Sequence, residues 1–478
     1  MAFYTLESFI VFRYKQEEAR RGIYLRQTIL IFFIQFAAFM TLVIKSGDLQ
    51  YLLFYGIDQL LLFGIIMITD MIYPKANRLI INHVCLLLGI GFIVLSRLSY
   101  TRALKQFLIV ILSMVFAMFM PSIMEKWKIL KDFKWVYAVA GIAGLSVVLI
   151  YGRLSHGSYI SFSLFGITFQ PSEFVKIIFV FFVAASLYES TKFFNIVLTT
   201  ILAALYVIIL VVSKDLGSAL LFFVAYIFMV FVATKNYLYL ILGFLGGAGS
   251  SYVAYRYFKH VQVRVQAWLD PWTYIDNQGY QVTQSLFGVG SGSWFGMGLM
   301  SGNPDTIPYV EMDSIFSAVC EEMGVVFGIM MVLVCISCFI MMMNMALLIK
   351  ENFYRYISYG LGVMYIFQVF LTVGGSIKFI PLTGVTLPLV SYGGSSVMTT
   401  LIMFYIVEGL YLIRQKEERN VRRKKRKPRR EYRTEEFGTE EFRTAEFRTE
   451  EFRTENFSQN APSEEDLVFL DWEDGKQR

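Results

Sequence analysis

Long apolar runs recur along this chain, from about Gln27 to Ile413. A helix needs about 20 residues to cross the hydrocarbon core of a bilayer. Only helices and closed barrels can satisfy their backbone hydrogen bonds there. The runs are continuous rather than alternating, which favours helices over strands. The chain is therefore predicted to be an all-α polytopic membrane protein, and its 56% hydrophobic and 17% charged residues fit that class.

About twelve membrane spans are predicted. Their centres are Phe36, Leu61, Leu88, Val110, Gly144, Phe181, Ala204, Val224, Gly243, Val332, Tyr365 and Phe404. The first residues are of mixed polarity and contain no short apolar region followed by a small-residue cleavage site, so no cleaved signal peptide is expected.

Basic residues near the ends of spans predict the orientation, because cytoplasmic loops are enriched in Lys and Arg. With twelve spans, the basic residues at 13–26, 126–134 and 414–430 all fall on one side. The basic loop at 97–105 falls on the opposite side and argues weakly against this topology. Both termini are therefore predicted to be cytoplasmic.

Three regions are predicted from composition. Residues 1–135 hold an N-terminal cytoplasmic segment and four membrane helices, and residues 136–413 form a membrane core with a large external loop at about 257–312. Residues 414–478 form a cytoplasmic tail that is first basic and then acidic, with a five-residue repeat from Glu431. A period of five builds no continuous apolar helix face, so the tail is predicted to be disordered. Its basic part is expected to contact anionic lipids, and docking of the repeats to a cytoplasmic partner is the alternative.

The cysteines and histidines give little support for metal or redox chemistry. Cys335 and Cys338 form a CxxC pattern inside an apolar run, where a free cysteine is commonly a small buried hydrophobe. His83, His156 and His260 are scattered without metal-ligand spacing. No organic cofactor and no nucleic-acid partner are predicted.

Asp313 lies where the long polar loop runs into an apolar helix. An ionisable residue at a membrane boundary is costly and is a functional candidate by default. If the helix includes Asp313, Glu321 lies about 80° around and about 12 Å deeper, so the two could line one cavity while Glu322 faces other helices. A simple N-cap role for Asp313 is the alternative.

Two further sets of charged residues lie at the start of predicted helices, on the external side. Pro171 suits a first helical position, Glu173 suits the first turn, and Lys176 follows three residues later. Lys176 could contact an anionic substrate while Glu173 orients it, or the two could form a structural ion pair. Asp215 could serve the same site or only cap its helix.

Two more external stretches contribute candidates, the large loop and the segment that follows the next-to-last predicted span. Arg264 precedes interface-type aromatic residues, and Gln284 lies in a glycine-rich run predicted to be flexible backbone near a substrate or a re-entrant hairpin. Lys378 begins a proline-interrupted segment. That segment ends in a serine–glycine run containing Ser395 and Ser396, which suits tight helix packing or phosphate binding through N–H groups.

Together these stretches predict an external cavity with the bases Lys176, Arg264 and Lys378 and several acids. Such a cavity suits an anionic, lipid-linked substrate, with one carboxylate acting as a general base.

At these positions the chain resembles the SEDS family (shape, elongation, division and sporulation), the RodA/FtsW group of bacterial cell-wall polymerases. The likeness covers about residues 136–413, and Pro381–Gly384 resembles the RodA branch more than the FtsW branch. Five motifs appear in the family's order: Gln170–Lys176, Asp215–Gly217, Gly279–Gln281 with Gln284–Ser285, Asp313 through Gly324, and Leu387–Ser396.

The resemblance implies a peptidoglycan glycosyltransferase that polymerises lipid II on the outer face of the bacterial cytoplasmic membrane, with a class B penicillin-binding protein as partner. Asp313 would remove the proton from the acceptor sugar's C4 hydroxyl, and undecaprenyl diphosphate would leave with inversion. A divalent cation (Mg or Mn) could help neutralise the diphosphate. The expected substrate-binding residues are Lys176, Glu173, Asp215, Arg264, Gln284, Glu321, Lys378, Ser395 and Ser396.

Three features depart from the family pattern. The chain has Glu311-Met-Asp313 where a His-Thr-Asp run is usual, Ser155–Ile160 lacks the usual arginine, and two additional spans precede the core. Two other functions therefore remain open. A lipid-linked sugar flippase would need charged residues near the midplane and on both sides, whereas the predicted cluster is one-sided. A non-catalytic scaffold for a cell-wall transpeptidase would not need Asp313.

Overall fold

The computed structural model describes residues 1–14, 17–151, 153–155, 158–164 and 167–426. The chain divides into two units at Arg422, and the candidate membrane spans of the described residues all lie in the first, Met1–Arg422. The predicted disordered tail began at residue 414, but residues 414–426 are helical and continue the last membrane helix, so that part of the prediction is wrong. The rest of the predicted tail, residues 427–478, lies outside the described residues.

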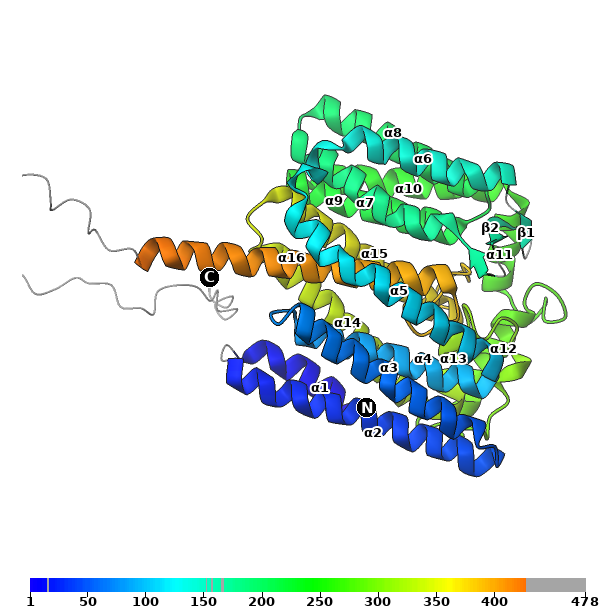
Figure 1. Ribbon diagram of the computed structural model, residues 1–478. Helices are drawn as coiled ribbons and strands as arrows, with labels where there is room; N and C mark the ends of the chain where they lie inside the picture. Colours follow the sequence, from blue (N-terminus) through cyan, green and yellow to red (C-terminus); the bar gives the residue numbers. More distant parts are fainter. Residues whose placement is uncertain (15–16, 152, 156–157, 165–166, 427–478) are drawn as a thin grey trace, which may run out of the picture. The chain divides into compact units, whose positions relative to one another are not determined.

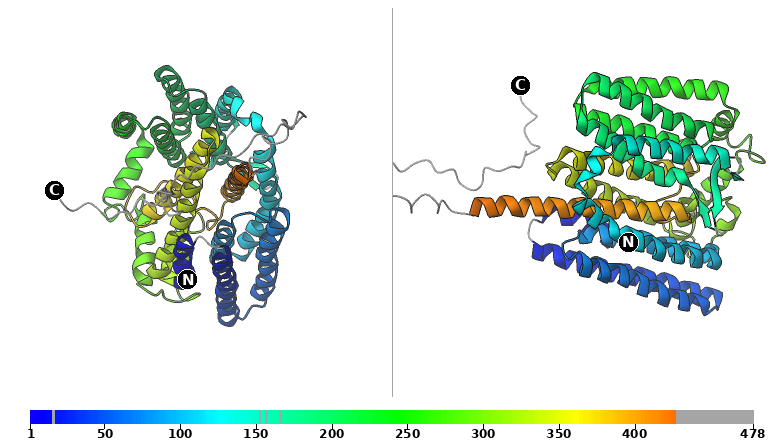
Figure 2. Two further views of the ribbon diagram at one scale, coloured as in Figure 1. Left: turned by 90° about the vertical axis from the view of Figure 1, so that its left-hand side faces the viewer. Right: turned by 45° about the horizontal axis from the view of Figure 1, so that its top comes forward.

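The described residues contain eleven helices that are long and apolar enough to cross a membrane. They run side by side in Figure 1 and are seen nearly end-on in the left view of Figure 2. These helices are α2 (Glu17–Ser46), α3 (Gln50–Ile72), α4 (Arg78–Leu98), α5 (Tyr100–Lys126), α7 (Pro171–Glu189), α8 (Phe193–Val212), α9 (Leu216–Thr234), α10 (Tyr237–Tyr257), α14 (Val325–Leu348), α15 (Asn352–Ser376) and α16 (Gly394–Arg426). They contain eleven of the twelve predicted span centres. The twelfth, Gly144, lies in α6 (Lys134–Tyr151), whose described apolar part is shorter.

The remaining elements are short and were predicted only in part. The predicted external loop contains α11 (Lys259–Leu269), α12 (Tyr280–Gly292) and η3 (Pro304–Thr306), and α13 (Ile315–Met323) follows it. The other short helical elements are α1 (Ala2–Ile10), η1 (Val11–Arg13) and η2 (Lys128–Asp132). In Figure 1, α11 and α12 lie at one end of the membrane helices.

The all-α class is confirmed, with one small exception between α6 and α7. β1 (Arg153–Ser155), β2 (Ser158–Leu164) and β3 (Ile167–Phe169) form an antiparallel sheet in the order β1-β2-β3. Apolar and polar residues alternate along Ile160–Leu164, which is the period of a strand. The alternation could therefore have predicted this sheet.

α4 is the most enclosed of the membrane helices: its most apolar stretch is entirely buried within the protein. It packs against α2, α3, α5 and α14. Gly91 allows the 387–393 segment to approach closely, because a Cβ at this position would lie 2.7 Å from the Val390 carbonyl oxygen. α4 therefore packs between the two N-terminal spans, α2 and α3, and the 387–393 segment, which lies close to Asp313.

α1 is anchored in this part of the bundle by buried polar contacts. The Tyr4 hydroxyl lies 2.8 Å from His83 Nδ1, and His83 Nε2 lies 3.0 Å from Ser337 Oγ on α14. His83 is thus a hydrogen-bonded core residue.

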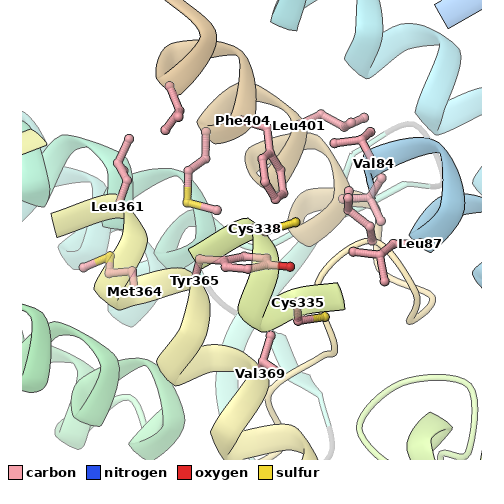
Figure 3. Packing of buried hydrophobic residues seen from close by; sticks show 14 of the residues in the cluster. Val84, Leu87, Cys335, Cys338, Leu361, Met364, Tyr365, Val369, Leu401 and Phe404 are labelled. Atoms are coloured by element: carbon pink, nitrogen blue, oxygen red, sulfur yellow. The ribbon is translucent and has the colours of Figure 1, made fainter. Parts of the chain in front are cut away.

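The CxxC cysteines belong to the apolar core. Cys335 and Cys338 are buried free thiols on α14, beside Tyr365 of α15 and Phe404 of α16 (Figure 3). The Tyr365 and Phe404 rings meet edge to face, with centroids 5.1 Å apart. The interpretation of these cysteines as packing residues is confirmed.

Candidate active site

Asp313 lies in a turn between η3 and α13, beside the first residues of α12. α12 and α13 run parallel. Gln281, near the start of α12, lies beside Asp313, just before α13, and a Cβ on Gly292, at the end of α12, would contact the backbone of Cys320 near the end of α13. α13 begins at Ile315, and Ser314 occupies its N-cap position. The alternative that Asp313 is an N-cap is therefore wrong. The predicted position of Glu321 relative to Asp313 is also wrong, because it assumed that both residues lie on one helix and they do not.

Hydrogen bonds hold Asp313 on both its side chain and its backbone. Gln281 Nε2 donates to Asp313 Oδ1 at 2.9 Å, and Ser376 Oγ donates to the Asp313 carbonyl at 3.3 Å. Gly384 faces the other carboxylate oxygen: it has a φ of +77°, and a Cβ there would lie 4.0 Å from Asp313 Oδ2. The carboxylate is thus aimed at a backbone position without a side chain.

Burial sets the proton affinity of Asp313. The residue is only 8% exposed, and loss of water raises the pKa of its carboxyl from 3.8 to about 7. The Glu311 charge contributes to this rise, whereas the Gln281 hydrogen bond and the Arg264 charge oppose it. A carboxylate with a pKa close to neutral can both accept and release a proton under ordinary conditions, which suits a general base.

Arg264 of α11 stands near two of the predicted acids. Its Nη1 donates to the Thr383 carbonyl at 2.9 Å. Burial lowers the pKa of the Arg264 guanidinium, and the charges of Asp215 and Asp313 oppose that effect. The prediction that Arg264 shares a site with these acids is consistent with this arrangement.

Three helix N-termini meet next to this arginine. Asp215 caps α9 by accepting from the Ser218 N–H at 3.1 Å, and its other oxygen accepts from Ser172 Oγ of α7 at 2.9 Å. The Gln170 N–H donates to Ser395 Oγ in the first turn of α16 at 2.9 Å. Helix N-termini carry partial positive charge and N–H groups that favour anions. Asp215 therefore is an N-cap, and it also joins α7 to α9.

Glu173 and Lys176 form a buried ion pair, 7% and 3% exposed, with 2.6 Å between Lys176 Nζ and Glu173 Oε2. Lys176 also donates to Gln368 Oε1 at 2.9 Å. Gln368 in turn donates to the Thr386 carbonyl at 3.0 Å and approaches Ser396 Oγ at 3.5 Å. The predicted pairing on one helix face is present, and the network links α7, α15, α16 and the 382–393 segment.

The other predicted residues are less closely joined to Asp313. Glu321 Oε1 accepts from the Asn303 N–H at 2.6 Å, and Trp268 Nε1 donates to the Lys378 carbonyl at 3.1 Å. Among the described residues, none of the hydrogen bonds or ion pairs found connects Glu321, Lys378 or Gln284 to the Asp313 carboxylate. Their role in substrate binding stays a prediction.

Sequence reasoning missed several residues of the site. Gln281 contacts Asp313 directly and stands within a recognised motif, but the prediction named Gln284 of the same motif. Gln368 lies in an otherwise apolar span, where an amide is a usable signal. Arg97 and Arg102 pair with acids more than 200 residues away. No local pattern could have predicted those pairs.

The described residues include no group of three or more His, Cys, Asp or Glu side chains placed to hold a metal ion. The expected divalent cation therefore stays a prediction, and the chemistry derived for Asp313 does not depend on it.

These features define a multi-pass helical membrane protein with a buried acid, an arginine and three helix N-termini gathered in one polar site. The chain belongs to the FtsW/RodA/SpoVE family, described as cell cycle proteins, whose model matches residues 50–416. The match confirms the family resemblance drawn from the motifs.

Curated relatives carry enzyme names. The chain is 32% identical over 384 residues to the peptidoglycan glycosyltransferase RodA of Mycobacterium bovis, covering 74% of this chain and 82% of that protein. It is also 32% identical over 279 residues to the probable peptidoglycan glycosyltransferase FtsW of Aeromonas salmonicida, covering 55% of this chain and 70% of that one. The match to RodA, at 32% identity over 74% of this chain, agrees with the predicted branch.

Solved structures support the fold. A chain from a peptidoglycan synthase complex, described as coordinating polymerization and crosslinking, aligns with a TM-score of 0.63 at 24% identity. The alignment covers 71% of this chain and 98% of that one. The rod shape determining protein RodA of Thermus thermophilus aligns with a TM-score of 0.53 at 21% identity, covering 72% and 98%.

Proposed function

We propose that this protein is a peptidoglycan glycosyltransferase that polymerises lipid II, with Asp313 as the general base. The single observation that carries the assignment is the burial of Asp313, whose carboxylate accepts a hydrogen bond from Gln281 and lies near the charge of Arg264. The enzyme names of the relatives supply the reaction class.

The reaction needs a base at the acceptor and a positive environment at the leaving group. Asp313 accepts the proton of the acceptor sugar's C4 hydroxyl as the oxygen attacks the donor's anomeric carbon. The bond to undecaprenyl diphosphate breaks at the same time, with inversion. Arg264 and the N-terminus of α16, which has no acid in its first turn, favour the negative charge that accumulates on the diphosphate. Gln281 orients the Asp313 carboxylate through one oxygen and leaves the other free to take the proton.

The flippase and scaffold alternatives fit this geometry less well. The ion pairs and acids of the site gather at helix ends rather than along a path through the bundle, whereas a transporter places charged groups near the midplane. A scaffold would gain nothing from a buried acid that is costly to ionise. Both alternatives remain outcomes of the deciding experiment.

We also propose an orientation and a partner. The site faces outward from the bacterial cytoplasmic membrane and both termini are cytoplasmic, because this topology puts all three main basic segments, 13–26, 126–134 and 414–430, on the inner side. The partner is a class B penicillin-binding protein.

The deciding experiment incubates the purified protein, with and without a co-expressed partner, with lipid II and Mg²⁺ or Mn²⁺, and reads glycan strands on a gel. The wild type and Asp276→Asn, an exposed acid in the same loop, should form strands, whereas Asp313→Asn should form none. Strands from Asp313→Asn at the wild-type rate would remove Asp313 from the general-base role. If no variant forms strands even with a partner, the flippase or scaffold interpretation takes precedence. A vesicle assay of lipid II translocation then separates those two.

A further inference from the structure

Two arginines at the junction of α4 and α5 pair with the two ends of the segment that carries Asp313. Arg102 Nη1 lies 2.8 Å from Glu311 Oε1, just before Asp313. Arg97 Nε lies 2.9 Å from Glu322 Oε1, near the end of α13, and Arg97 also contacts Asp305 and the Gly302 carbonyl. These arginines belong to the basic loop at 97–105, which argued weakly against the predicted topology. Their ion pairs with acids of the site explain why basic residues occur on this side of the membrane.

The Arg102–Glu311 pair is more than a surface contact. Exposed ion pairs contribute little to stability, about 0–1 kcal/mol. Here the Arg102 side chain is 46% exposed but that of Glu311 is only 10% exposed. Loss of Arg102 would leave a buried carboxylate without its counter-charge, which is the costly way to break such a pair.

The turn that carries Asp313 is also fixed to the 387–393 segment. The Tyr392 N–H donates to the Glu311 carbonyl at 2.7 Å, and Ser391 Oγ donates to the Met312 carbonyl. Gln106 of α5 in turn donates to the Ser391 carbonyl at 3.1 Å. α5 thus supports the turn twice, through the Gln106 contact and through the Arg102 ion pair.

The charged groups around Asp313 come from two elements. Arg264 of α11 favours its ionised form, and Glu311 in its own turn opposes it. Glu311 itself faces Arg102 of α5, and both charges act on the Tyr392 hydroxyl. Arg102 therefore acts on Asp313 through Glu311.

We propose that Arg102 is a positioning residue for the reaction: its ion pair with Glu311 offsets the Glu311 charge that opposes ionisation of Asp313. This inference rests on the proposed function. It is also specific to this chain, because Glu311 stands where the family pattern has a different residue.

The test is the pH dependence of lipid II polymerisation. Removing the Arg102 charge should leave Glu311 uncompensated and keep Asp313 protonated to higher pH. Arg102→Gln should therefore shift the acid limb upward, with a rate loss of about three- to tenfold at pH 6 and a near-normal rate at pH 9. Glu311→Gln should shift the limb downward, and the double variant should match Glu311→Gln alone. Arg102→Lys should restore the wild-type limb.

Lys105→Gln is the matched control, because Lys105 is an exposed cation three residues further along α5. It should leave the profile unchanged. A purely structural role for Arg102 predicts an equal rate loss at every pH, and that result would overturn the inference. An additive shift in the double variant would overturn it as well. If the wild type forms no strands, the proposed function fails; if it forms strands but Arg102→Gln keeps the wild-type limb, only this inference fails.

Discussion

Asp313→Asn should abolish turnover and, at alkaline pH, should also stabilise the protein. Burial raises the pKa of Asp313 from 3.8 to about 7, so the folded protein is destabilised when this carboxylate is ionised. One pKa unit corresponds to about 1.4 kcal/mol, which places the cost at about 4 kcal/mol above pH 7. Asparagine has similar size and cannot ionise, so it avoids this cost.

The sign of the pH dependence follows from proton binding. Between pH 3.8 and about 7 the folded protein retains a proton on Asp313 that the unfolded chain has already released. Raising the pH through this window therefore lowers the stability of the wild type relative to the variant. The two proteins should be similar at pH 4, and the variant should be more stable at pH 8.

The assay is thermal unfolding of both proteins in detergent micelles at several pH values. Asp276→Asn is the control, because this acid is exposed in the same external segment and its substitution should give no pH-dependent difference. A Tm difference between wild type and Asp313→Asn that is equal at pH 4 and pH 8 would show that burial does not raise the Asp313 pKa. The assignment of Asp313 as a base poised near neutrality would then lose its physical basis.

Three further predictions concern other regions. Lys176→Ala should raise the half-saturation concentration for lipid II and lower Tm, since a buried Glu173 carboxylate without its counter-charge lowers stability by about 3–5 kcal/mol. Adding Glu173→Gln should restore most of the Tm but not the affinity for lipid II. Asp58→Leu should raise Tm, because it removes a fully buried carboxyl whose oxygens have no hydrogen-bond partner among the described residues, an arrangement that lowers stability by about 1–3 kcal/mol. A lower Tm would show that Asp58 is satisfied by a bound group. Deleting residues 431–478 should leave the turnover of the purified enzyme unchanged, and a large loss would assign the tail a catalytic role.

The membrane helices could be predicted because one physical requirement governs each of them. An apolar run of sufficient length must be helical in a bilayer, and the eleven spans follow from that alone. Asp313 could be singled out for a related reason: a charge at the end of such a run is costly without a purpose. The same rule should have drawn attention to Asp58, which lies inside an apolar run and is fully buried in α3.

The contacts within the site could not be predicted in the same way. Lys176 reaches Gln368 across 192 positions, and Arg97 reaches Glu322 across 225. Hydropathy and helical periodicity describe neighbours along one element, whereas these pairs depend on which helices pack together. The start of α13 at Ile315 likewise depends on the turn that Gln281 and Ser376 hold, so the projection of Glu321 from Asp313 failed.

The site combines a costly group with supports from several helices. Ionised Asp313 opposes folding, and its pKa stays as low as about 7 because Gln281 and Arg264 favour the charged form. Glu311 acts in the opposite direction, so a chain with an acid at this position needs a nearby cation to keep its base usable. Arg102 is placed to supply that charge from a different helix. The substitution of an acid two residues before Asp313 and the arginine at the start of α5 are thus best understood as one feature, and replacing either alone should shift the pH range in which the enzyme works.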